Sequence, residues 1–157
     1  MLKRLKWLLI ATTAILVVTL TYAILVVRYA EAEMTAIQGY ADSLLALNDV
    51  EALHSIHRFN GLESYIVANV LHSTGQEVYF FVRDGSVQHY FPRRDLIDAD
   101  EAMAIAKSLI NNGEISNVQL GILGEIPIFE VQIAVDELVH YLVINAKNRE
   151  ILMNFYL

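Results

Sequence analysis

The chain has five histidines, the residue type best suited to metal binding or to general acid–base catalysis at neutral pH. His54 and His57 lie three residues apart in an expected strand, which would place their side chains on opposite faces. The other three fall in separate expected strands, at His72, His89 and His140. There is no cysteine and no H-E-x-x-H or comparable ligand spacing. We therefore predict no metal site and no cofactor, and interpret the histidines as surface or strand-packing residues.

Motifs of nucleophilic catalysis are also missing from the sequence. It contains no G-x-S-x-G, S-x-x-K or S-D-N motif and no glycine-rich phosphate loop. Asp98, Asp100 and Glu101 cluster, but a helix N-terminus attracts acidic residues through its dipole. The basic pair Arg93-Arg94 stands alone. We predict no catalytic residue and no small-molecule substrate, and hence a protein that is not an enzyme.

Aromatic side chains are the better indication of function. Six of them gather near the expected strands of the first half: Tyr65, Tyr79, Phe80, Phe81, Tyr90 and Phe91. Most should lie in the core, but a small domain rarely has room for all six, and exposed Tyr and Phe anchor protein interfaces. We predict a binding surface whose candidate partner-binding residues are Tyr65, Tyr79, Phe81, Tyr90 and Phe91.

The elements that must position these residues follow a repeated order. Apolar residues at spacings of three and four predict a helix over residues 29–48, and β-rich runs separated by turns predict about four strands over residues 51–91. The turn containing Asp84-Gly85 is typical of a hairpin. In the run 78–82 both faces are apolar, so this strand needs cover on both sides, from the other half of the chain or from a partner.

The second half repeats the pattern. Asp98, with Glu101 three residues on, resembles a capping box, and Asn111-Asn112-Gly113 ends the expected helix. Four strands are predicted after it, over residues 116–123, 127–135, 138–145 and 150–156. We predict an α+β fold of two small units, each a helix packed on a four-stranded antiparallel sheet, spanning residues 29–92 and 93–157.

Residues 1–28 predict a membrane anchor. Lys3, Arg4 and Lys6 precede an uncharged run over residues 7–27, and these 21 residues would form a helix of about 31 Å, which matches a hydrocarbon core of ~30 Å. Only Arg28 follows at once, so the positive-inside rule places the N-terminus in the cytoplasm and residues 29–157 outside the cell. The alternative is a secretory signal cleaved at Ala32, but signal h-regions usually span about 7–15 residues.

Charge and cysteine content restrict the partner and the source. All 18 acidic residues and 7 of the 11 basic ones follow Arg28, so the exterior part carries 7 − 18 = −11. An acidic surface argues against nucleic acid or anionic lipid as the partner of this part. An exterior domain without cysteine is more typical of bacteria than of small secreted eukaryotic domains.

Several segments resemble the TseB-like (YpmB) family of low-GC Gram-positive bacteria. The first repeat of that family is similar to residues 61–67 and 78–82, and its second, PepSY-like repeat is similar to residues 98–113 and 127–131. The resemblance covers essentially the whole chain. It implies a single-pass membrane protein with two cystatin-like or PepSY-like units that face the cell wall.

The same resemblance implies a role. Members of the family are implicated in regulating cell-wall (peptidoglycan) elongation together with a class B penicillin-binding transpeptidase. We therefore expect a non-enzymatic, membrane-anchored binding protein whose partner is a penicillin-binding protein. The alternative is an inhibitor of an extracellular protease, because PepSY-like and cystatin-like units serve that purpose elsewhere.

Overall fold

A computed structural model describes the backbone of residues 2–157 and the side chains of Lys6 and of residues 12–157. The side chains of the predicted anchor at residues 7–11 lie outside the described residues. The chain divides into two compact units, Met1–Gly39 and Tyr40–Leu157.

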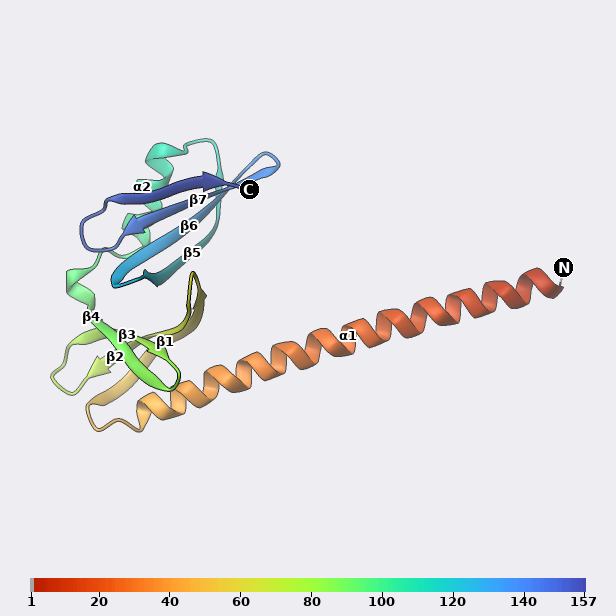
Figure 1. Cartoon of the computed structure of the whole chain (residues 1–157), viewed down its shortest axis with the longest axis horizontal. Coiled ribbons are helices and arrows are strands. Elements are labelled where there is room, and N and C mark those ends of the chain that lie inside the picture. Colours follow the sequence, from red (N-terminus) through yellow and green to blue (C-terminus); the bar gives the residue numbers. More distant parts are fainter. Residues whose placement is uncertain (1) are drawn as a thin grey trace. The chain divides into compact units, whose positions relative to one another are not determined.

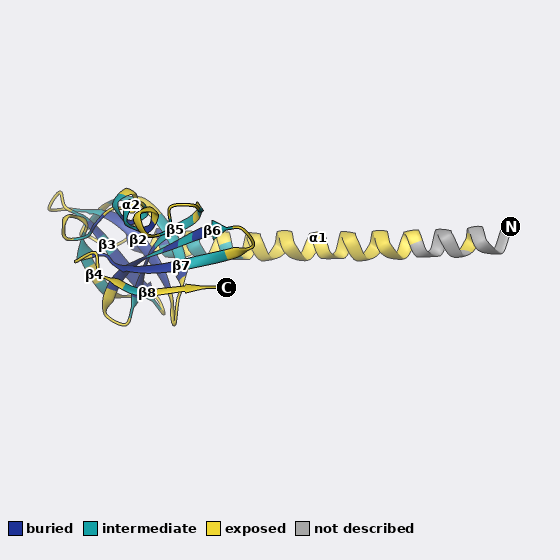
Figure 2. Ribbon diagram, turned by 90° about the horizontal axis from the view of Figure 1, so that it is seen from above, coloured by how far each residue is buried: buried dark blue, intermediate teal, exposed yellow. Residues whose placement is uncertain are grey.

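One long helix, α1 (Leu2–Leu45), contains both the predicted membrane segment and the predicted helix over residues 29–48. No glycine or proline occurs between residues 2 and 38, so nothing interrupts it. Every described side chain from Thr12 to Glu31 is exposed (Figure 2). The hydroxyls of Thr19 and Thr21 donate to carbonyls one turn earlier, so these polar groups are satisfied within the helix. Within the described residues, α1 is the one helix long and apolar enough to cross a membrane, a property that a signal sequence shares.

Sheet A follows α1 and is antiparallel, in the order β1-β2-β3-β4 (Figure 1). Its strands are β1 (Val50–Asn60), β2 (Ser64–His72), β3 (Glu77–Arg83) and β4 (Ser86–Pro92). Asp84 and Gly85 have φ angles of 52° and 75°, as the tight turn between β3 and β4 requires. The four strands predicted for the first half are confirmed.

A short 3-10 turn, η1 (Arg93–Asp95), leads to α2 and to sheet B, which has the order β5-β6-β7-β8 (Figure 1). The elements are α2 (Ala99–Leu109), β5 (Glu114–Leu123), β6 (Ile126–Val135), β7 (Leu138–Asn145) and β8 (Ile151–Tyr156). The Asp98 carboxylate accepts a hydrogen bond of 2.8 Å from the Glu101 N–H, which confirms the predicted helix start.

The prediction that each sheet has a helix of its own is correct for sheet B only. The α2 helix packs against β5 and β6 through buried Ala102 and Ala106. Sheet A has no separate helix among the described elements, because residues 29–45 continue α1 without a break. The end of α1 contributes Ala41 and Leu44 to the buried residues of the second unit.

The two sheets share one buried core. Phe59, Tyr65, Val67 and Phe81 of sheet A belong to the same hydrophobic cluster as α2 and the inner residues of sheet B. The predicted boundary at residue 92 coincides with the end of β4, yet the residues on its two sides fold into one compact unit.

Phe59 lies where the sheets meet. A Cβ atom added at Gly121 of β5 would stand 2.4 Å from the Phe59 ring, so the ring packs directly on the glycine backbone. Beside it, the His57 Nε2 atom lies 2.9 Å from the Leu120 carbonyl oxygen. The glycine therefore allows a close approach that any larger residue would block.

Candidate functional site

An apolar groove lies on the face of sheet A that points away from the shared core. Tyr79 and Phe81 of β3 pack on that core, so by strand alternation Val78 and Phe80 face the other way. The groove has a volume of about 570 Å³, and its apolar lining residues are Leu47, Val78, Phe80, Val87, Tyr90 and Pro92.

The floor of the apolar groove is buried and its walls are accessible. Val78 and Phe80 are only 6% and 7% exposed, whereas Tyr90 is 67% exposed. Leu47 and Val87 are also exposed large apolar residues. A buried apolar floor with an exposed aromatic wall is the arrangement in which Tyr anchors a protein–protein contact.

One rim of the apolar groove is polar and fixed by hydrogen bonds. The His72 Nε2 atom lies 3.2 Å from Asp49 Oδ2, and its Nδ1 atom lies 3.2 Å from Thr74 Oγ1. The Ser73 N–H also donates to the Asp49 carbonyl. These contacts join the segment after α1 to the β2–β3 turn, so the rim is preformed.

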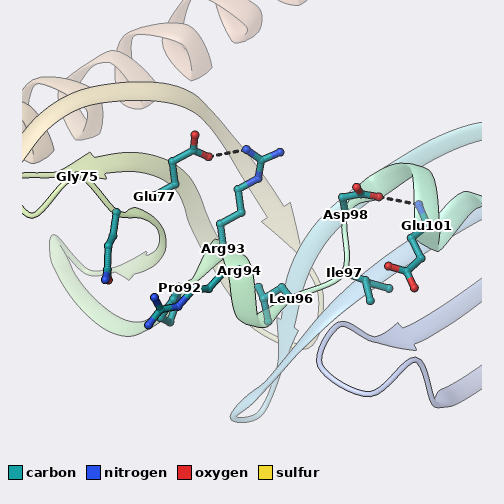
Figure 3. A pocket seen from close by; sticks show the side chains of 10 residues that line it. Gly75, Glu77, Pro92, Arg93, Arg94, Leu96, Ile97, Asp98 and Glu101 are labelled. Carbon is teal, nitrogen blue, oxygen red and sulfur yellow. Dashed lines mark hydrogen bonds and ion pairs between the residues drawn. The ribbon is translucent and has the colours of Figure 1, made fainter.

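A second groove, the joint groove, adjoins the first at Gln76 and Pro92. It has a volume of about 510 Å³ and lies along the segment between β4 and α2 (Figure 3). The Arg93 guanidinium donates a hydrogen bond of 2.6 Å to Glu77 Oε2 (Figure 3). This hydrogen bond lowers the pKa of Glu77 from its ordinary value and raises that of Arg93.

The other charges of the joint groove are also committed to structural contacts. Glu101 forms an ion pair with Arg149 of the β7–β8 turn, and Arg94 lies 3.7 Å from Asp95. Asp98 caps α2, and the Ile97 N–H donates to the Ala146 carbonyl. Of the charged groups that stood out in the sequence, Arg93, Asp98 and Glu101 are therefore engaged in structural contacts. No cluster of three or more His, Asp or Glu residues suited to a metal ion occurs among the described residues.

The structure separates the five aromatic residues predicted to bind a partner. Tyr65 and Phe81 are 4% and 0% exposed and lie in the shared core, while Tyr79 and Phe91 are partly buried against it. Burial raises the pKa of both Tyr65 and Tyr79, because it disfavours the charged phenolate. Only Tyr90 of the five is exposed. Binding by these residues stays a prediction, and Tyr90 is the one that a partner can reach in this structure.

The other lining residues of the apolar groove were not predicted from the sequence as a binding site. The floor residues Val78 and Phe80 did have a sequence signal, since the apolar run 78–82 required cover on both faces. Leu47 and Val87 had no such sequence signal. Their position beside Val78 and Phe80 depends on the path of the chain after α1 and on the pairing of β3 with β4.

The histidines lie at scattered positions. His72 lies on the rim of the apolar groove, His57 contacts Leu120, and the rings of His89 and His140 pack near Tyr65 and Tyr156. A register shift between Leu53 and Ser55 interrupts the regular alternation of β1. The expectation that the side chains of His54 and His57 face opposite ways assumed a regular alternation, which this register shift breaks.

No protein-family model and no curated protein matches the sequence. Among solved structures, the chain is similar to the YpmB protein from Bacillus subtilis, with a TM-score of 0.63 and 20% identity, covering 75% of this chain and 94% of that chain. The fold is YpmB-like. A Clostridium difficile protein described as a candidate lipoprotein aligns with a TM-score of 0.43 and 12% identity, over 78% of this chain and 90% of that chain. The predicted resemblance to the TseB-like (YpmB) family is thereby confirmed as a structural match, which at this identity is a likeness of fold.

Proposed function

We propose that this chain is a non-enzymatic, membrane-anchored binding protein that regulates cell-wall elongation by docking a class B penicillin-binding transpeptidase. The observation that carries the proposal is the apolar groove, where exposed Tyr90 stands above a buried apolar floor in a YpmB-like fold. The partner and the role come from the family resemblance.

The long apolar helix supports the location that this role needs. The basic residues Lys3, Arg4 and Lys6 precede the apolar segment, which by the positive-inside rule directs residues 29–157 to the outside of the cell. A retained anchor keeps the groove and a membrane-bound transpeptidase on the same surface. Confinement of both proteins raises their effective concentration, so a modest groove can support functional binding.

The proposed test places a photo-crosslinking amino acid at Tyr90 of the full chain in its native membrane. The expected result is a crosslinked product that contains a penicillin-binding transpeptidase. The matched control is the same substitution at Gln88, which is also exposed in β4 but does not line the apolar groove. Crosslinking of the transpeptidase should be strong from position 90 and weak from position 88.

Three outcomes would contradict the proposal. Equal crosslinking from both positions would show that the groove does not select the partner, and no transpeptidase in either product would reject the partner. Recovery of a protease from position 90 would instead favour the alternative of a protease inhibitor.

A further inference from the structure

One residue on the polar rim of the apolar groove is of a type that changes its charge near neutral pH. Among the described residues that line this groove, His72 is the one histidine. The other ionisable groups of the lining are the Asp49 carboxyl and the Tyr90 phenol. Protonation of His72 therefore adds a positive charge beside an apolar floor.

The hydrogen bonds around the His72 ring define where its proton lies. The Thr74 N–H donates a hydrogen bond of 3.3 Å to Nδ1, so Nδ1 presents a lone pair and carries no proton. The single proton of the neutral ring is then on Nε2, which lies 3.2 Å from Asp49 Oδ2 and can donate to it. The rim is therefore built around the neutral ring with its proton on Nε2.

A second proton on the ring is incompatible with this geometry. It would bind to Nδ1 and face the Thr74 N–H, and two donors repel each other. The Thr74 hydroxyl, 3.2 Å from Nδ1, could accept from the new N–H, but the backbone N–H of Thr74 would lose its partner in the ring. The Thr74 N–H belongs to the β2–β3 turn, in which the Gly75 N–H also donates to the His72 carbonyl at 2.8 Å. Protonation therefore loosens the turn that forms the rim.

The charges around His72 compensate the imidazolium only weakly. Asp49 contacts the ring from the segment after α1, but its side chain is 56% exposed, so an ion pair there contributes little. From β1, His72 pairs with uncharged Val50, and the next residue, Glu51, is exposed. Glu77 of β3 lies on the other face of the sheet, where it binds Arg93. The Asp49 carboxylate is thus the one charge in direct contact with the ring among the described residues.

We propose that protonation of His72 releases the partner from the apolar groove, so that binding weakens as the pH falls. This inference rests on the proposed function, in which a partner docks on this groove. The His72 side chain is 26% exposed, and an occupant that contacts the lining would exclude water from it. Excluding water from a charged imidazolium costs far more than excluding it from a neutral ring. The occupied groove therefore favours neutral His72, and by linkage protonated His72 favours the empty groove.

The first measurement needs no partner. Nitrogen NMR of the full chain in detergent should show the proton of the neutral His72 ring on Nε2. Hydrogen exchange of the Thr74 amide, relative to an unstructured amide at the same pH, should accelerate by about fivefold or more when the ring is protonated, because one hydrogen bond is lost. In His72→Gln the same relative rate should not change with pH. A neutral ring protonated on Nδ1, or Thr74 protection that protonation leaves unchanged, would overturn the inference.

The second measurement uses the photo-crosslinker at position 90 of the full chain in its native membrane. Between about pH 8 and about pH 5.5, the yield of the crosslinked transpeptidase should fall about threefold or more. His72→Gln offers an N–H to Asp49 and does not titrate in this range, so its yield should differ little between the two pH values. His72→Arg carries a permanent charge and should give a low yield at both. Thermal unfolding at both pH values shows whether each variant stays folded.

The matched control is His140→Gln. His140 is a partly exposed histidine of β7 that does not line the apolar groove, so this variant should lose yield with falling pH as the unsubstituted chain does. Titration of the partner affects all variants alike and cancels in their ratios. Equal losses in His72→Gln and His140→Gln would overturn the inference and leave the proposed function intact. A chain that crosslinks no transpeptidase at either pH would instead reject the proposed function.

Discussion

The two sheets have the same strand order but differ in how their faces are covered. In sheet A, residues 65–70 of β2 are all buried, so both faces of this strand are covered. In sheet B, β6 alternates between buried Phe129, Val131 and Ile133 and partly exposed Glu130 and Gln132. Strand β2 of sheet A is therefore covered on both faces, whereas β6 of sheet B has one covered face and one largely open face.

One exception to the alternation of β6 shows where the sheets meet. Ile128 belongs to the open face by its position, yet it is only 3% exposed. It pairs with Gly121, on which Phe59 of sheet A packs. On this face of β6, Ile128 is therefore buried beside the contact with Phe59 of sheet A, while Glu130 and Gln132 are partly exposed.

The strongest test of this comparison removes the side chain that joins the sheets. Phe59→Ala deletes a ring that is 2% exposed, and we expect it to lower the free energy of unfolding by about 3–5 kcal/mol. Urea unfolding of the full chain in detergent measures the change. Tyr90→Ala, which removes an exposed ring of sheet A, should change it by no more than about 0.5 kcal/mol. Equal losses for the two variants would contradict a central role for Phe59.

We expect a smaller loss of unfolding free energy when a methyl group is added where the Phe59 ring packs on Gly121. Gly121→Ala places a methyl group 2.4 Å from the ring carbons and should cost about 1–3 kcal/mol of unfolding free energy. In a Phe59→Ala background the same methyl group meets open space, so most of this cost should disappear. A double-mutant cycle by urea unfolding measures the coupling between the two sites. Additive effects would mean that the glycine is needed for another reason.

The sequence predicted the strands of both sheets well, because each strand has a clear apolar period and a turn signal at its ends. The alternation of apolar and polar residues over 129–133 is typical of a strand with one covered face, and the apolar run 78–82 indicated a strand covered on both faces. The sequence allowed residues 29–45 to continue the membrane helix but did not decide it, since an apolar stripe has the same spacing in one helix or in two. It also could not show that Phe59 packs on Gly121, a contact between residues 62 positions apart.

The candidate site was predicted less well than the fold, for a physical reason. An aromatic residue in a strand has the same local pattern whether its face meets the core or solvent, so Tyr65, Phe81 and Tyr90 could not be told apart. Only the packing of sheet A against α2 and sheet B buries the first two. Conversely, the apolar groove depends on Leu47, which reaches β3 and β4 through the fold of the chain and not through any motif.

The smallest expected change in stability concerns the ion pair between Glu77 of β3 and Arg93 of η1, in the joint groove. This prediction tests whether charge as well as apolar packing stabilises the position of sheet A. Because the Arg93 hydrogen bond lowers the pKa of Glu77 in the folded state, the unfolded chain binds more protons near the ordinary value of 4.5. The stabilising contribution is therefore full above that pH and is lost as the pH falls through the lowered pKa. Glu77→Gln should remove this part of the acid dependence of the unfolding midpoint, while Glu125→Gln in the exposed β5–β6 turn should leave it unchanged. If both variants keep the wild-type pH profile, the two sheets are held together by their shared apolar core and this ion pair contributes little.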